Sequence, residues 1–78
     1  MNATTAKNLI ETNKAAAISE LLSAIEASIQ NKASKGWNRV CVSDIVSEYN
    51  SPIITEVYNT LRTNGFMVNV MTHTVTWN

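Results

Sequence analysis

The sequence "NGFMVNVMTHTVTWN", from Asn64 to Asn78, decides the fold of this chain. Asn64-Gly65 is typical of a helix stop, and the residues after it alternate between apolar and polar with the period of two that strands show. We therefore predict one strand from Phe66 to Met71 and a second from about Thr74 to Trp77, folded on each other. The side chains expected on the buried side of this hairpin are Phe66, Val68, Val70, Val75 and Trp77.

The turn between these strands has an unfavourable sequence for a tight hairpin. Thr72-His73 lacks the Asn-Gly or Gly that two-residue hairpin turns prefer, so the pattern predicts a bulge or another irregularity there. His73 is the only histidine of the chain, and we expect it to face solvent in this turn.

Two helices are predicted before the hairpin. Ser43 would cap a short helix from Asp44 to Tyr49, and Ser51 would cap a longer one that has Pro52 at its first position. The longer helix carries apolar residues at i, i+3, i+4 and i+7, which is the helical period and indicates a core-facing stripe. These residues are Ile54, Val57, Tyr58 and Leu61.

A short strand precedes these helices, in "RVCVS". Val40 and Val42 would share its buried face and Cys41 the other face. Without a second histidine or an adjacent base, Cys41 is interpreted as a small packed side chain and not as a nucleophile.

A long amphipathic helix opens the chain, from about Thr5 to Asn31, in a stretch without Gly or Pro. Its apolar stripe is Ile18, Leu22, Ile25 and Ile29, widened by Leu21. Gly36 would end it in the left-handed conformation. The upstream part is less regular, so residues 1–14 are predicted to form an N-terminal arm or a helix extension, with Asn13 as a candidate break, and residues 15–78 a single small domain.

The predicted order is therefore helix, strand, helix, helix, strand, strand. We expect an α+β fold in which the long N-terminal helix packs on one face of a small three-stranded antiparallel sheet.

The composition excludes several classes of function. Apolar residues make up 45% of the 78 residues and charged residues only 15%, with six basic and six acidic side chains that cancel. A neutral chain lacks the long-range field that draws proteins to nucleic acid or anionic membranes. One Cys and one His are too few for a zinc site, and nothing resembles a catalytic constellation or a phosphate loop. We expect no enzyme activity, no cofactor and no metal. The N-terminus lacks the features of a secretory signal, so the chain is expected to stay in the cytoplasm where it is made.

Residues 42–70, "VSDIVSEYNSPIITEVYNTLRTNGFMVNV", resemble winged-helix domains: a strand, a short helix, a turn, a candidate recognition helix and a wing. The resemblance implies a winged-helix-like topology and, as an alternative function, a DNA-binding regulator. The residues that would then contact DNA are Thr55, Asn59 and Arg62 on the recognition helix and the basic cluster Lys32, Lys35 and Arg39. We rank this alternative second, because the predicted wing carries no Lys or Arg.

Nearly the whole chain is also similar to a group of small proteins of tailed bacteriophages. The pieces that match are "TTAKNLIETNKAAAISELLSAI", "KASKGW", "RVCVS", "VYNTLRTNGFMVNV" and "TVTW". This resemblance implies a non-enzymatic phage protein, made in the host cytoplasm and present in the virion as a structural or accessory component, such as a capsid decoration or tail accessory. Its partners would be other phage structural proteins or copies of itself, in an oligomer or larger assembly. A small binder of a host protein is the third alternative.

Three side chains are the candidate partner contacts. Leu9 and Ile10 would be exposed on the N-terminal arm if the domain is compact, and Trp37 follows a Gly in a loop. Trp37 could equally cap the end of the long helix, and the sequence leaves both roles open.

Overall fold

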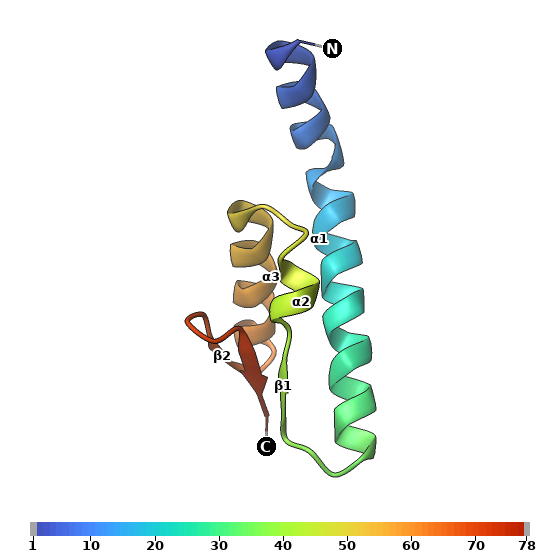
Figure 1. The fold of residues 1–78 in the computed structure, drawn as a ribbon, viewed down its shortest axis with the longest axis vertical. Helices are drawn as coiled ribbons and strands as arrows, with labels where there is room; N and C mark the ends of the chain where they lie inside the picture. The colour runs from blue at the N-terminus through green and yellow to red at the C-terminus, as the bar shows by residue number, and fades with distance from the viewer. Residues whose placement is uncertain (1, 78) are drawn as a thin grey trace.

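The computed structural model describes residues 2–77, apart from the side chains of residues 6–12. It is an α+β fold with the predicted order of elements (Figure 1): helix α1 (Ala3–Ser34), strand β1 (Arg39–Cys41), helices α2 (Ser43–Val46) and α3 (Ser51–Thr63), and strands β2 (Met67–Asn69) and β3 (Thr74–Thr76). The three strands form one antiparallel sheet in the order β1-β3-β2. The element order and the strand pairing give a winged-helix-like topology.

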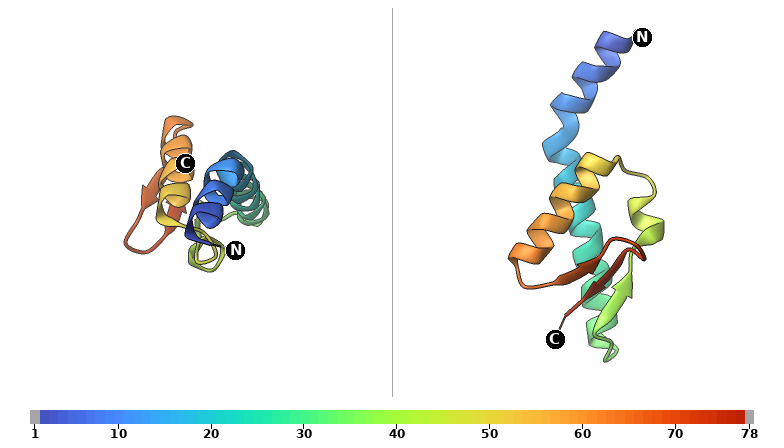
Figure 2. Two further views of the ribbon diagram at one scale, coloured as in Figure 1. Left: turned by 90° about the horizontal axis from the view of Figure 1, so that it is seen from above. Right: turned by 90° about the vertical axis from the view of Figure 1, so that its left-hand side faces the viewer.

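One helix makes up much of the length of the molecule. Asn2 caps α1 by accepting the Thr5 N–H at 2.9 Å, and the helix then continues through Asn13 without a break. The molecule measures 48 × 19 × 18 Å, and the first turns of α1 project beyond the body formed by the other elements (Figures 1 and 2). The N-terminal segment is therefore an extension of the helix.

The core lies between α1, α3 and one face of the sheet. The register aligns Val40, Val75 and Val68 across the three strands, and this valine row faces the core while the flanking rows face outward. This is the one-sided alternation expected of an antiparallel sheet with one solvated face. The buried core is completed by Leu21, Ile25 and Ile29 of α1, Val42, Val46 of α2, and Ile53, Val57, Tyr58 and Leu61 of α3.

The helix stripes differ slightly from the predicted ones. On α1 the fully buried line runs through Leu21, and Ile18 and Leu22 flank it as partly buried residues. On α3 the first buried residue is Ile53, and Ile54 lies at the margin. Ser43 and Ser51 are the first residues of their helices instead of the caps, and neither α2 nor α3 has a side-chain cap.

Both long helices end in the same way. At the end of α1 the N–H groups of Gly36 and Trp37 donate to Ala33 and Lys32, and at the end of α3 those of Gly65 and Phe66 donate to Arg62 and Leu61. This pair of bonds is the Schellman motif, which needs a left-handed residue. Gly36 and Gly65 supply it with φ of 87° and 96°.

The hairpin is shorter than predicted. Strand β2 ends at Asn69, because the Asn69 side-chain oxygen accepts the N–H groups of Met71 (3.0 Å) and Thr72 (3.4 Å) and draws the chain into a turn. The prediction that Val70 is buried is therefore wrong: it is 52% exposed. The predicted irregularity is confirmed at His73, which has a left-handed φ of 52°.

Candidate interaction surfaces

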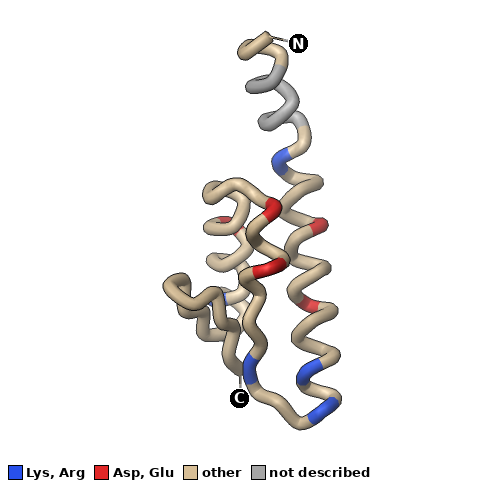
Figure 3. Tube along the Cα trace, in the orientation of Figure 1, with Lys and Arg blue, Asp and Glu red and all other residues tan. Residues whose placement is uncertain are grey.

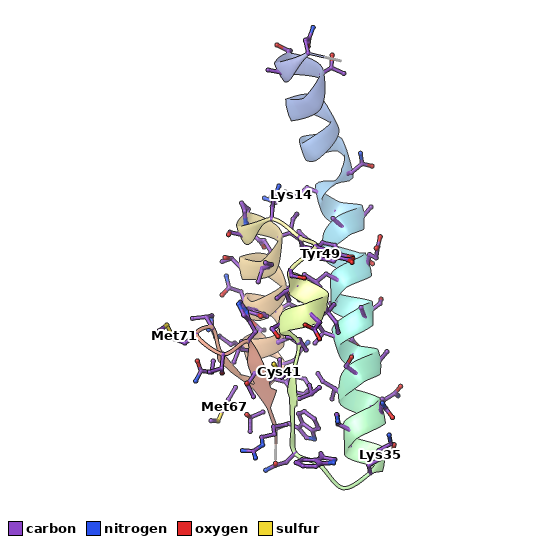
Figure 4. All side chains as sticks on the ribbon, in the orientation of Figure 1. Lys14, Lys35, Cys41, Tyr49, Met67 and Met71 are labelled. Carbon is purple, nitrogen blue, oxygen red and sulfur yellow. The ribbon has the colours of Figure 1, made fainter. Side chains whose placement is uncertain are left out.

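The basic cluster lies at one end of the molecule, where α1 turns into β1. Lys32 is in the last turn of α1, Lys35 is its C-cap and Arg39 begins β1; Figure 4 labels Lys35 at this end. Among the residues that the structure describes, none of the three cations pairs with a carboxylate. A groove of about 280 Å³ lies beside them, lined by Lys32, Trp37, Arg39, Val40, Cys41 and Thr74.

Trp37 belongs to both the helix end and the surface. Its backbone N–H donates to the Lys32 carbonyl at 2.9 Å and closes the helix, while its side chain remains 51% exposed. The Lys32 Nζ lies 5.6 Å from the centroid of the indole ring, a cation–π distance that holds the ring beside the groove.

The candidate DNA-reading face of α3 lies elsewhere. Thr55 and Asn59 are exposed, but Arg62 is turned toward the sheet: its guanidinium donates to the Asn59 side-chain oxygen at 3.5 Å and to the Val68 carbonyl at 3.4 Å. Arg62 thereby covers the open edge of β2. Because β1 and β2 are opposite edges of the sheet, the structure separates these three residues from the basic cluster instead of combining them.

The hairpin exposes apolar side chains. Met67, Val70 and Met71 are exposed to 69%, 52% and 89%, and the chain from Gly65 onward contains no Lys or Arg. Figure 4 labels Met67 and Met71 on the outside of the hairpin. Such a surface lacks the charge that a DNA-binding wing uses to contact phosphate.

Leu9 and Ile10 were predicted as partner contacts. Their backbone lies in the projecting part of α1, and their side chains lie outside the described residues.

A polar contact in the core was not foreseen from the sequence. The Tyr58 hydroxyl and the His73 Nδ1 share a hydrogen bond of 2.8 Å, and Tyr58 is only 2% exposed. Burial, followed by the nearby Cys41, raises the pKa of Tyr58. The prediction that His73 faces solvent is wrong, because its left-handed backbone turns the ring inward over α3. The poor turn sequence was the only signal of this arrangement.

Cys41 is exposed, so its assignment as a packed side chain is wrong. The sheet is covered on one face only, and the alternation in "RVCVS" places the thiol on the outer face. A hydrogen bond with the Ser43 hydroxyl at 3.4 Å lowers the pKa of the Cys41 thiol, and Asp44 opposes this shift. No described His lies within hydrogen-bond contact of its sulfur, whose other partner is the Thr72 carbonyl at 3.6 Å.

Within residues 2–77, as far as their side chains are described, no three His, Cys, Asp or Glu groups come together to hold a metal ion. In the same part of the chain, no helix combines the length and the apolar character needed to cross a membrane.

No protein-family model matches this sequence, and no similar curated protein or solved structure was found for it.

Proposed function

We propose that this chain is a non-enzymatic bacteriophage protein, a structural or accessory component of the virion that acts through protein–protein contacts. Its sequence resemblance to small tailed-phage proteins supports the origin. The projecting half of α1 supports the mode of action and is the observation that carries the proposal.

The described side chains of the projecting segment lie outside the hydrophobic core. The α1 residues that pack on the core begin at Ala17, and the described side chains before it are exposed. The turns from Ala3 to Ala16 span about 21 Å at about 1.5 Å per residue. Helices in proteins draw most of their stability from tertiary packing, which these exposed turns lack, so a partner surface would stabilise them. A neutral surface with exposed Trp37, Met67 and Met71 suits close packing against protein.

Chemical cross-linking of purified particles from the source of this sequence tests the proposal. An amine-reactive reagent should link Lys14, Lys32 or Lys35 to a capsid or tail protein, or to another copy of this chain, because these amines are exposed or partly exposed on the proposed contact surfaces. Particles that yield no such link, together with links to a host protein in infected cells, would contradict a virion role and favour the host-binding alternative.

DNA binding is the second candidate, favoured by the winged-helix-like topology. If α3 reads DNA, fluorescence anisotropy with duplex DNA should show binding that weakens steeply with added salt, and Arg62→Ala should weaken it. We expect no salt-dependent binding, since Arg62 is engaged with Val68 and the hairpin exposes apolar side chains and no Lys or Arg.

A further inference from the structure

The charges of this neutral chain are separated in space. Lys32, Lys35 and Arg39 lie at the end of the molecule where α1 meets β1, and this surface, with Trp37, is called the basic end. Figure 3 shows the described acidic residues of α1 and α2 along the middle of the molecule. Net neutrality therefore hides two surfaces of opposite sign.

The acidic surface is built by α1 and the α2–α3 region. The Tyr49 hydroxyl donates to the Glu20 carboxylate at 2.8 Å, which ties α1 to the segment after α2. Glu20 first, and then Glu48, raise the pKa of Tyr49, so both carboxylates act on the same hydroxyl. Asp44 lies in the first turn of α2. Glu20, Asp44 and Glu48 are exposed and are called the acidic shoulder.

The acidic shoulder also contains a hollow. A groove of about 250 Å³ lies where α1 leaves the body, and its lining includes Ala17, Glu48, Tyr49 and Ile53, together with Asn13 and Lys14. Its lining combines apolar side chains with one carboxylate, Glu48, and one amine, Lys14. The basic end instead presents the exposed indole ring of Trp37 beside the Lys32 amine.

On α1, the acidic and basic residues of the two surfaces lie too far apart to neutralise each other. Glu20 and Lys32 are twelve residues apart on the same helix, which places them about 18 Å apart along its axis. This separation exceeds twice the Debye length of about 8 Å at physiological salt. Each surface can therefore attract a partner of the opposite charge. A second copy of this chain supplies such a partner, because its acidic shoulder is complementary to the basic end of the first copy.

We propose that the basic end of one copy docks on the acidic shoulder of another, with Trp37 as the apolar anchor of the contact. The inference rests on the proposed function, because it specifies copies of this chain as one partner in the protein contacts. Single exposed ion pairs contribute little, so three charges on each side and a large aromatic side chain at the centre must act together.

A charge-swap experiment tests this docking. One variant carries Lys35→Glu and Arg39→Glu, which make the basic end acidic; the other carries Asp44→Lys and Glu48→Lys, which make the acidic shoulder basic. Each reversal changes the net charge by two, so the variants carry −4 and +4 from a wild type of zero. Average mass is measured by sedimentation equilibrium at about 50 mM and about 500 mM salt, across a Debye length of about 14 to 4 Å.

Docking predicts a specific set of masses. The wild type should associate at low salt and return to the 8.6 kDa monomer at high salt. Each variant alone should stay monomeric, and an equimolar mixture of the two should associate again. Trp37→Ala, which keeps the backbone N–H that closes α1, should weaken wild-type association at least tenfold.

The matched control separates docking from general attraction. A variant with Glu26→Lys and Glu56→Lys also carries +4 but keeps both the basic end and the acidic shoulder. Alone, it should therefore associate at low salt, whereas the Asp44→Lys, Glu48→Lys variant of the same net charge should stay monomeric. A complementary mixture that stays monomeric, or two +4 variants that associate to the same extent, would overturn the docking. Either failure leaves the cross-links to capsid or tail proteins unaffected, so it can be told apart from failure of the proposed function.

Discussion

A single residue, His73, connects three elements of the fold. Its carbonyl accepts the Val42 N–H at 2.8 Å, its ring bonds to Tyr58 of α3, and its left-handed backbone starts β3. The hairpin is thereby fixed to the core through a polar contact and not only through the valine row.

Replacement of Tyr58 by Phe should destabilise the protein by about 1–2 kcal/mol, because it leaves the partly buried His73 Nδ1 without its partner. Urea denaturation followed by circular dichroism measures the change. Tyr49→Phe is the matched control: it also removes one hydroxyl hydrogen bond, but on the surface, and should cost less than about 0.5 kcal/mol. Equal losses of unfolding free energy in the two variants would show that the Tyr58–His73 hydrogen bond stabilises the protein no more than a surface hydrogen bond does.

The same tyrosine predicts a pH dependence. Burial raises the pKa of Tyr58 above its unfolded value of about 10, so its contribution is fully present below about pH 10 and is lost as pH rises through the raised pKa. The unfolding free energy of Tyr49→Phe, which retains Tyr58, should therefore fall faster above about pH 10 than that of the Tyr49→Phe, Tyr58→Phe double variant. If the unfolding free energies of the two variants fell in parallel above about pH 10, the raised pKa of Tyr58 would be contradicted.

The helix-ending glycines make a further residue-scale prediction. Gly65→Ala should destabilise the protein by about 1 kcal/mol, since an L side chain disfavours its positive φ, although an added Cβ would meet no neighbour within 4 Å. Gly65→Asn should cost less, because Asn tolerates the left-handed region. Thermal unfolding of both variants distinguishes this backbone cost from a packing defect, which would make the larger Asn the worse substitution.

At the scale of elements, the sequence predicts the glycine stops of α1 and α3 well, but it predicts the helix caps, the end of α2 at Val46 and the end of β2 poorly. Gly36 and Gly65 could be identified because few residues adopt a positive φ, whereas β2 ends at Asn69 through a side-chain bond to Met71 that alternation does not reveal. Likewise, Leu21 is buried in place of Leu22, and Ile53 in place of Ile54. The packing of α1 against α3, and not periodicity alone, decides which side chains of each helix are buried.

Helix α1 is expected to divide into a supporting half and a projecting half. Deletion of residues 1–14 should leave the unfolding free energy of the body within about 1 kcal/mol of the full chain, because core packing begins at Ala17. The same deletion should lower the assembly state. Ile25→Ala, which removes a fully buried side chain from the other half, should cost about 2–5 kcal/mol. Light scattering and urea denaturation together test both halves; an unchanged solution mass after the deletion would contradict a role of the projection in assembly.

At the scale of the whole molecule, the sequence predicts the α+β class and the order of elements, but only part of the candidate surfaces. Lys32, Lys35 and Arg39 are close in sequence and could be recognised as a cluster. Glu20 and Glu48 are brought together only by the packing of α1 against the α2–α3 region, a long-range contact that local patterns do not encode. The proposed self-docking therefore depends on the tertiary structure.

The central claim is that this chain is part of a virion, and quantitative mass spectrometry of purified phage particles tests it most directly. The account predicts this chain at a fixed ratio to the major capsid or tail protein, unchanged by a high-salt wash that removes adsorbed proteins. Its absence from particles, despite abundance in infected cells, would contradict the account.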